Sequence, residues 1–201
     1  MATYNFPSIT PTTQTFELVT NTKQFQSPLS NAIQTVSRNG SYWKTTMVFN
    51  NLSGAERAEL QAFIAKLDGQ THRMLLRDYG HVRRGEGSAV VNISTQTNLV
   101  QGMTGIILDG APADVDNFFR TGDYISFNNE LHMVTANADT TSTGSMSVDI
   151  APPVRKPTNQ DSPVTFSNAT GVFMMTNNPQ WRTQAPYFSS ITIEAIEDVL
   201  A

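Results

Sequence analysis

The sequence contains no cysteine, which excludes a disulfide framework and thiolate metal ligands. Charged residues account for only 15% of it, and no apolar run approaches the roughly 20 residues that span a bilayer. The N-terminal residues, MATYNFPSIT, lack the basic region and apolar core of a secretory signal. We therefore expect a protein that is neither secreted by such a signal nor inserted into a membrane.

Uncharged polar residues take the place of the missing charges. Thr, Asn, Ser and Gln occur throughout, while hydrophobic residues make up 39% of the chain. This composition favours short strands and turns over long charged helices. At 201 residues the chain can form one large or two small domains with a real core. The expected fold class is mainly β, of the α+β type.

The charge is unevenly distributed along the chain. Residues 1–88 carry a net charge of +3, residues 89–150 carry −6 and residues 151–201 carry −1. An acidic middle third is typical of a separate module inserted into a host domain. We therefore predict a discontinuous host domain, 1–88 plus 151–201, and an inserted domain, 89–150.

The first third begins with strand and turn signals. Asn39-Gly40 predicts a hairpin turn, because both residues tolerate positive φ. From Tyr42 to Phe49 the side chains then alternate between two faces, with Trp43, Met47 and Phe49 on the same one. A period of two indicates a half-buried strand.

A helix follows this strand. Ser53 and Glu56 have the spacing of a capping box, which predicts a helix from Gly54 to about Asp68. Its apolar residues repeat at helical spacing and form one stripe: Leu60, Phe63, Ile64 and Leu67. A second strand is predicted from His72 to Tyr79. Strand, amphipathic helix and strand are therefore the expected core unit.

From residue 89 short apolar segments alternate with Gly and Asn turns. Asn128-Asn129 predicts a hairpin inside this region. Five short strands in about sixty residues predict a small, nearly closed barrel, for which the OB type is the commonest choice. The later strands, which have no partner helix, are expected to complete the sheet begun at Tyr42. The strands predicted in the two regions are Ala89–Ile93, Gly105–Leu108, Tyr124–Phe127, Leu131–Thr135, Met146–Ile150, Val172–Thr176 and Ser189–Ile196.

In this order the elements resemble the distal tail proteins of siphophages, especially the short type found in T5-like phages. The resemblance covers about Ser37 to the end of the chain. It rests on the aromatic strand SYWK, the capped helix LSGAERAELQAFIAKLDGQ, the strand HRMLLRDYG, the hairpin GDYISFNNELHMV and the late strand ending in ITIEA.

The resemblance implies a tail-tube-like β-sandwich or barrel with one packed helix and an OB-like insertion. Members form a hexameric ring between the tail tube protein and the hub, baseplate or straight-fibre protein, and the tape-measure protein and DNA pass through its lumen without specific binding. It also implies a virion protein at the tail tip, made in the cytoplasm of the host bacterium, with no catalytic residues. A tail-tube or tube-terminator protein is the alternative within this class.

Basic residues around the second strand are the first candidates for binding. Arg73 and Arg77 share a strand face with Leu75, and we expect them to pair with acids at its margins. Arg83 and Arg84, just before the insertion, are predicted to contact a neighbouring protomer. Phosphate binding by this group is a weaker interpretation.

Aromatic residues of the insertion are the second candidates. The strand pattern places most of them in the core, but OB-folds also use such rings to bind sugars. Phe118, Phe119 and Tyr124 are therefore candidate glycan-binding residues, and host surface glycans are a candidate partner. A carbohydrate-binding module that acts in host adsorption is the alternative from another functional class.

Signals for metal, cofactor or catalysis are weak. His72, His81 and His132 lie in different predicted elements, without the spacing of a metal site. The acidic stretch 109–117 lacks the EF-hand pattern. The chain has no G-x-S-x-G elbow, and Gly85-Glu86-Gly87 is not a phosphate-binding loop. We predict no metal, no cofactor and no enzymatic activity.

Overall fold

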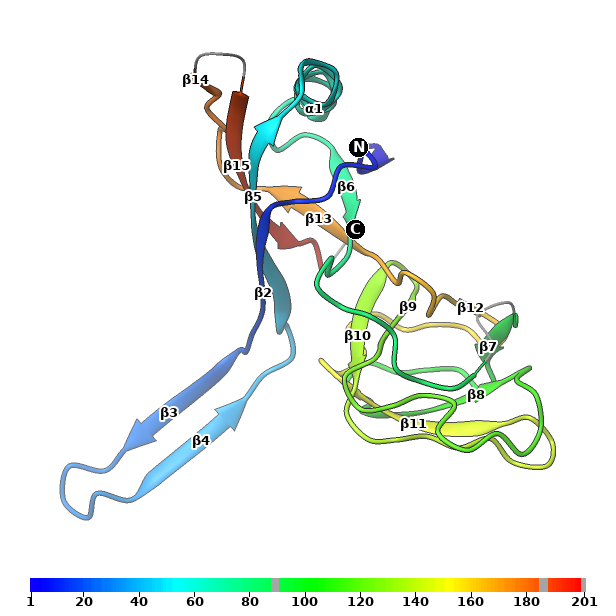
Figure 1. The fold of residues 1–201 in the computed structure, drawn as a ribbon. Helices are drawn as coiled ribbons and strands as arrows, with labels where there is room; N and C mark the ends of the chain where they lie inside the picture. The colour runs from blue at the N-terminus through cyan, green and yellow to red at the C-terminus, as the bar shows by residue number, and fades with distance from the viewer. Residues whose placement is uncertain (88–90, 185–187, 200–201) are drawn as a thin grey trace.

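The computed structural model describes residues 1–87, 91–184 and 188–199. Strands make up 42% of the chain and the helix of the described part 7%, which confirms the mainly β fold class. Figure 1 shows a curled sheet that carries the helix, a barrel-like sheet beside it, and a two-stranded arm that projects away from both.

The curled sheet collects strands from both ends of the chain. Its order is β1-β6-β13-β15-β5-β2, and β14 pairs with β15. The prediction that late strands complete the sheet begun at Tyr42 is confirmed, because β15 lies antiparallel to β5 from Ser189 to Ile196. The seven strands are β1 (Thr3–Asn5), β2 (Thr13–Val19), β5 (Tyr42–Leu52), β6 (Arg73–Leu76), β13 (Gly171–Met175), β14 (Arg182–Gln184) and β15 (Phe188–Glu197).

The predicted helix is confirmed as α1, Gly54–Leu67. The Ser53 hydroxyl accepts the Glu56 amide at 3.3 Å, and the Glu56 carboxylate accepts the Ser53 amide at 2.9 Å. These hydrogen bonds hold the pKa of Glu56 below its usual value. The predicted stripe packs into the core of the curled sheet: Leu60, Phe63 and Leu67 are buried and Ile64 is half-buried.

The second sheet is nearly closed, as the sequence predicts. Its order is β12-β7-β8-β11-β10-β9, and reciprocal backbone hydrogen bonds of 2.7 and 2.8 Å between Ser126 and Thr165 join its edges. Asn128 and Asn129, both at positive φ, form the predicted hairpin. The strands are β7 (Ile93–Thr95), β8 (Gly105–Asp109), β9 (Tyr124–Phe127), β10 (Glu130–Val134), β11 (Met146–Ala151) and β12 (Pro163–Val164).

The barrel continues past Ile150, the end expected from the sequence. β12 belongs to its sheet, and Val154, Val164 and Phe166 pack in its core. The other expected boundary, between Ser88 and Ala89, and the start of the strand predicted from Ala89 lie outside the described residues.

The arm consists of β3 (Thr22–Gln26) and β4 (Ile33–Ser37). The predicted hairpin at Asn39-Gly40 is wrong, because β4 pairs with β3, whereas β5 pairs with β2 and β15. Asn39-Gly40 instead lies where the long β2–β5 ribbon leaves the sheet and continues as the arm. There Gly40 has a φ of 114° and the Asn21 side chain donates to the Asn39 carbonyl at 3.2 Å.

Candidate functional site

The barrel meets the curled sheet at a buried junction. Tyr124 in β9 and Leu131 in β10 belong to the barrel strands but pack in the core of the curled sheet. The indole of Trp43 in β5 donates to the Leu131 carbonyl at 2.9 Å. The two sheets are therefore fastened by shared side chains and are not merely connected by the chain.

An ion pair crosses this junction. Arg155 donates from Nη1 to Glu197 Oε2 at 2.5 Å and from Nη2 to Glu197 Oε1 at 2.7 Å. The same carboxylate accepts the backbone amides of Trp43, at 3.1 Å, and Leu131, at 3.0 Å. A bidentate pair with additional hydrogen bonds is the geometry in which a buried charge is compensated.

Two further charged or polar groups complete what we call the clasp: Arg155, Glu197, Glu130 and His132. The Arg155 amide donates to Glu130 Oε2 at 3.0 Å, and His132 Nε2 lies 3.3 Å from that oxygen. His132 Nδ1 lies 2.8 Å from the carbonyl of Pro152, which can only accept, so Nδ1 donates. Burial raises the pKa of Glu130, but His132 and Arg155 outweigh it and leave this pKa below its usual value.

The clasp is almost closed to solvent. Its four side chains are at most 5% exposed, so a solute has no access to its carboxylates or its imidazole. General acid–base chemistry needs a group within hydrogen-bond reach of a substrate. The clasp instead pairs Arg155 with Glu197 across the junction, while two of its buried atoms, Glu130 Oε1 and His132 Nε2, form no hydrogen bond with the described residues.

The linker from β6 to the barrel lies flat against the barrel. The buried carboxylate of Asp123 accepts the backbone amides of Arg84 at 2.7 Å and Gly85 at 2.9 Å. A Cβ on Gly85 would lie 2.2 Å from the Phe118 carbonyl oxygen, and one on Gly87 would lie 2.4 Å from the Phe118 ring. These glycines permit close approach of the backbone, which is one of the uses of glycine.

The structure separates the two predicted inter-subunit arginines. The Arg83 guanidinium donates to the carbonyls of Gly87 and Phe118 and lies 4.8 Å from the centre of the Phe166 ring. Burial lowers the pKa of Arg83, and the nearby Asp123 partly opposes this. Arg83 is thus engaged within its own chain, whereas the side chain of Arg84 is exposed.

The three candidate glycan-binding aromatics lie in cores. Phe118 and Phe119 are fully buried and meet edge to face with ring centres 5.0 Å apart. Tyr124 is 7% exposed and packs against the ring of Trp43 at 5.5 Å. Burial, with Asp78 as a second cause, raises the pKa of Tyr124. Phe118 and Phe119 therefore leave no face on which a sugar could stack, and Tyr124 reaches only a pocket of about 90 Å³.

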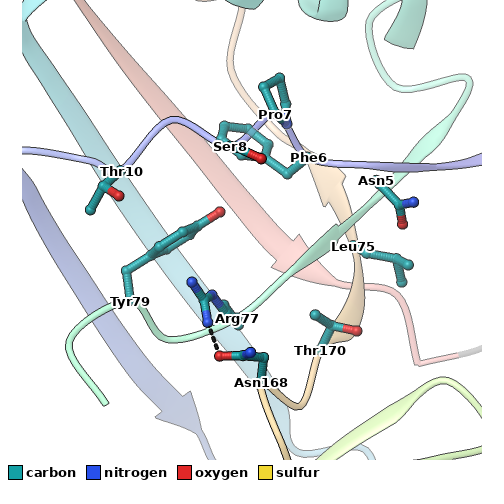
Figure 2. Close-up of a pocket in the computed structure, with 10 residues that line it drawn as sticks. All are labelled: Asn5, Phe6, Pro7, Ser8, Thr10, Leu75, Arg77, Tyr79, Asn168 and Thr170. Carbon is teal, nitrogen blue, oxygen red and sulfur yellow. Dashed lines mark hydrogen bonds between the residues drawn. The ribbon is translucent and has the colours of Figure 1, made fainter. Parts of the chain in front are cut away.

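A pocket of about 340 Å³, lined by both polar and apolar side chains, lies beside β6 (Figure 2). Arg77 and Tyr79 follow β6, Asn168 precedes β13, and the segment from Asn5 to Thr10 passes across the pocket from them. The Arg77 guanidinium donates to the Asn168 side-chain oxygen and lies 5.0 Å from the centre of the Tyr79 ring. Burial raises the pKa of Tyr79, an effect that Arg77 partly opposes.

Arg73 and Arg77 differ in their partners. Arg73 forms the predicted ion pair, with Nε 2.5 Å from a carboxylate oxygen of Asp198. Arg77 bonds to the neutral Asn168, and the residues that line its pocket include no carboxylate. The prediction of an acidic partner therefore holds for Arg73, while Arg77 remains a cation in an otherwise uncharged pocket.

The three histidines have different surroundings and do not form one site. His72 Nδ1 accepts the Ala2 amide at 3.2 Å, His81 packs edge to face on Tyr124, and His132 belongs to the clasp. Within 1–87, 91–184 and 188–199, no three metal-ligating side chains come together.

The helix of this part of the chain is too short and too polar to cross a membrane.

No family model matches the chain. No curated protein matches its sequence either.

The sequence-based analysis missed Arg155 and Glu197. One signal was present: Glu197 continues the buried face of Ile191, Ile193 and Ala195 at a spacing of two. A carboxylate on the buried face of a strand requires a buried cation. Nothing in the sequence indicates which cation that is, because Arg155 follows a two-proline segment with no periodicity.

Proposed function

We propose that the protein is a non-enzymatic structural protein that assembles with copies of itself into a ring at the tip of a siphophage tail. The observation that carries this proposal is the arm. Every residue of β3 and β4 is exposed, and the hairpin has no core of its own within the chain. An isolated two-stranded hairpin is marginally stable at best in water. We therefore infer that the arm is stabilised by contact with another chain.

The side chains of the arm fit a protein partner. Phe25 and Ile33 are 57% and 59% exposed, and Leu29 at the tip is 97% exposed. The register places Phe25 opposite Gln34 on one face and Ile33 opposite Gln26 on the other. Each face therefore offers an apolar side chain among amides and hydroxyls, as a surface that is covered in an assembly does.

Charge supports a second copy of the chain as that partner. The chain carries no acidic residue between Glu17 and Glu56, so the charged residues in the arm and directly after it, Lys23 and Arg38, are both cations. The region 89–150 has a net charge of −6 and exposes Asp114, Asp116 and other carboxylates. An arm that contacts the next copy makes a heterologous interface, and such interfaces close into rings when the rotation permits.

In this proposal the ring connects the tail tube protein to the hub, baseplate or straight-fibre protein, with the tape-measure protein and DNA in its lumen. The protein is then a virion component, and six copies are expected from the family resemblance. A tail-tube or tube-terminator protein would stack into longer or paired rings.

The mass of the purified protein in solution, measured by light scattering, tests the proposal. We expect about six times the 22.1 kDa of one chain, and a central hole in negatively stained particles. A monomer at every concentration, with no ring in the images, would contradict the proposal. Stacked rings of open-ended length would favour the tail-tube alternative.

A further inference from the structure

Arg77 is a cation whose position is fixed by neutral groups. The Asn168 side chain accepts one of its N–H groups, and the ring of Tyr79 covers the guanidinium from 5.0 Å (Figure 2). Arginine carries five N–H donors, so donors remain for a ligand after this bond is made. A guanidinium held in one orientation is suited to a carboxylate, which it can bind through two parallel hydrogen bonds.

The rest of the lining is uncharged and mixes hydrogen-bonding side chains with the apolar side chains of Phe6, Pro7 and Leu75. Asn5, Ser8 and Thr10 line one side, and Asn168 and Thr170 line the other. Amide and hydroxyl side chains both donate and accept, which matches a ligand with several hydroxyl groups. The apolar lining residues add the nonpolar surface that small-molecule sites combine with a few polar groups.

The size of the pocket favours a sugar over a peptide as the ligand. A volume of about 340 Å³ lies at the small end of the range for small-molecule sites, roughly 300–1,000 Å³. This leaves room for one or two rings, whereas an extended peptide needs a longer groove or a free strand edge. We propose that this pocket binds a carboxylate-bearing sugar, with Arg77 on the carboxylate and the amides and hydroxyls on the ring hydroxyls.

No residue of the arm lines this pocket, so variants of the arm leave the lining side chains unchanged. The pocket also lies outside the aromatic set of the barrel. Binding at this pocket and assembly through the arm can therefore be tested separately.

The experiment is a ligand-observed NMR titration of the full chain with glucuronate, with glucose as the uncharged match. We expect glucuronate to bind and glucose to bind at least tenfold more weakly, since hydrogen bonds to a charged group are the strong ones. Equal binding of the two sugars, or no binding of glucuronate, would overturn the proposal. Tighter binding of N-acetylglutamate than of glucuronate would overturn it in favour of an acidic peptide.

Variants locate the binding. Arg77→Gln should lower glucuronate affinity about tenfold or more, and Arg77→Lys should restore part of it, because lysine keeps the charge but not the planar fork. Arg182→Gln removes an exposed arginine that does not line this pocket and should bind as the unmodified chain does. Thermal melting of each variant confirms folding. Unchanged affinity in a folded Arg77→Gln variant would place the sugar elsewhere and overturn the assignment.

Discussion

The arm and the clasp differ in which side chains they expose to water and which they bury. In the arm every strand residue is exposed, and apolar side chains such as Phe25 face water. In the clasp four polar or charged side chains are buried and meet one another across two sheets. The charged side chains of the clasp have partners of opposite charge within the same chain, although Glu130 Oε1 and His132 Nε2 form no hydrogen bond with the described residues, whereas the apolar side chains of the arm have no partner that covers them. Stability should therefore reside in the clasp and assembly in the arm.

Removing the arm should have the largest effect on assembly. Replacing Thr22–Ser37 by an Asn-Gly turn closes the β2–β5 ribbon without its extension. We expect the ring to be lost completely and a folded monomer to remain, because no residue of β3 or β4 is buried. Light scattering and thermal melting measure the two properties. A truncated chain that still forms rings would contradict the role of the arm.

A smaller change sharpens this test. Phe25→Thr removes the largest apolar side chain of the arm but keeps a residue that favours strands. It should weaken assembly, whereas Gln24→Thr, on the opposite face of the same strand, should leave it nearly unchanged.

Breaking the clasp should have the largest effect on the single chain. Glu197→Gln keeps the shape of the side chain but removes the carboxylate that Arg155 binds through two hydrogen bonds, which leaves only Glu130, 3.5 Å from Arg155 Nε, as a buried counter-charge. We expect a loss of about 3–5 kcal/mol in the free energy of unfolding. Urea denaturation of the arm-deleted monomer gives this value without a contribution from assembly.

The matched control is Glu17→Gln. Glu17 pairs with Lys44 at 3.7 Å, but both side chains are well exposed. An exposed pair contributes about 0–1 kcal/mol, so this variant should lose little. Equal losses in the two variants would mean that burial does not set the strength of the clasp.

The linker glycines should have the next largest effect. Gly87→Ala places a methyl group against the ring of Phe118, which is fully buried and cannot move away. Overpacking of this kind costs about 1–3 kcal/mol. Gly54→Ala is the control, because nothing lies within 4 Å of its added Cβ, and it should be neutral or stabilising by about 0.4–1 kcal/mol. A neutral Gly87→Ala would show that the linker does not lie against Phe118 in solution.

The sequence predicted those elements that have a strong local pattern. The capping box at Ser53 located α1, the period of two located β5 and β15, and Asn128-Asn129 located the hairpin of the barrel. In each case the pattern and the burial have the same cause, since one face of the element packs on a core.

The arm and the clasp could not be predicted in this way. Both faces of β3 and β4 are exposed, so their residues show no period of two. The turn signal at Asn39-Gly40 predicts a hairpin there, whereas residues 27–32 form the turn of the arm. The clasp joins Arg155 to Glu197, which are 42 positions apart and in no shared pattern. The Arg77 pocket likewise combines three distant segments. Contacts of this kind depend on the tertiary fold, which local periodicity does not encode.

Removing the helix cap should have the smallest effect, and it distinguishes stability of the single chain from assembly into a ring. β5 begins shortly after the arm and ends directly before the Ser53 cap. Ser53→Ala removes the hydroxyl that accepts the Glu56 amide and should lower the free energy of unfolding by about 1 kcal/mol. Ser142→Ala, an exposed turn residue, is the control. Since the cap lies outside the arm, Ser53→Ala should melt earlier but assemble with the same mass. A change in ring mass with this variant would show that stability of the sheet and assembly through the arm are coupled along β5.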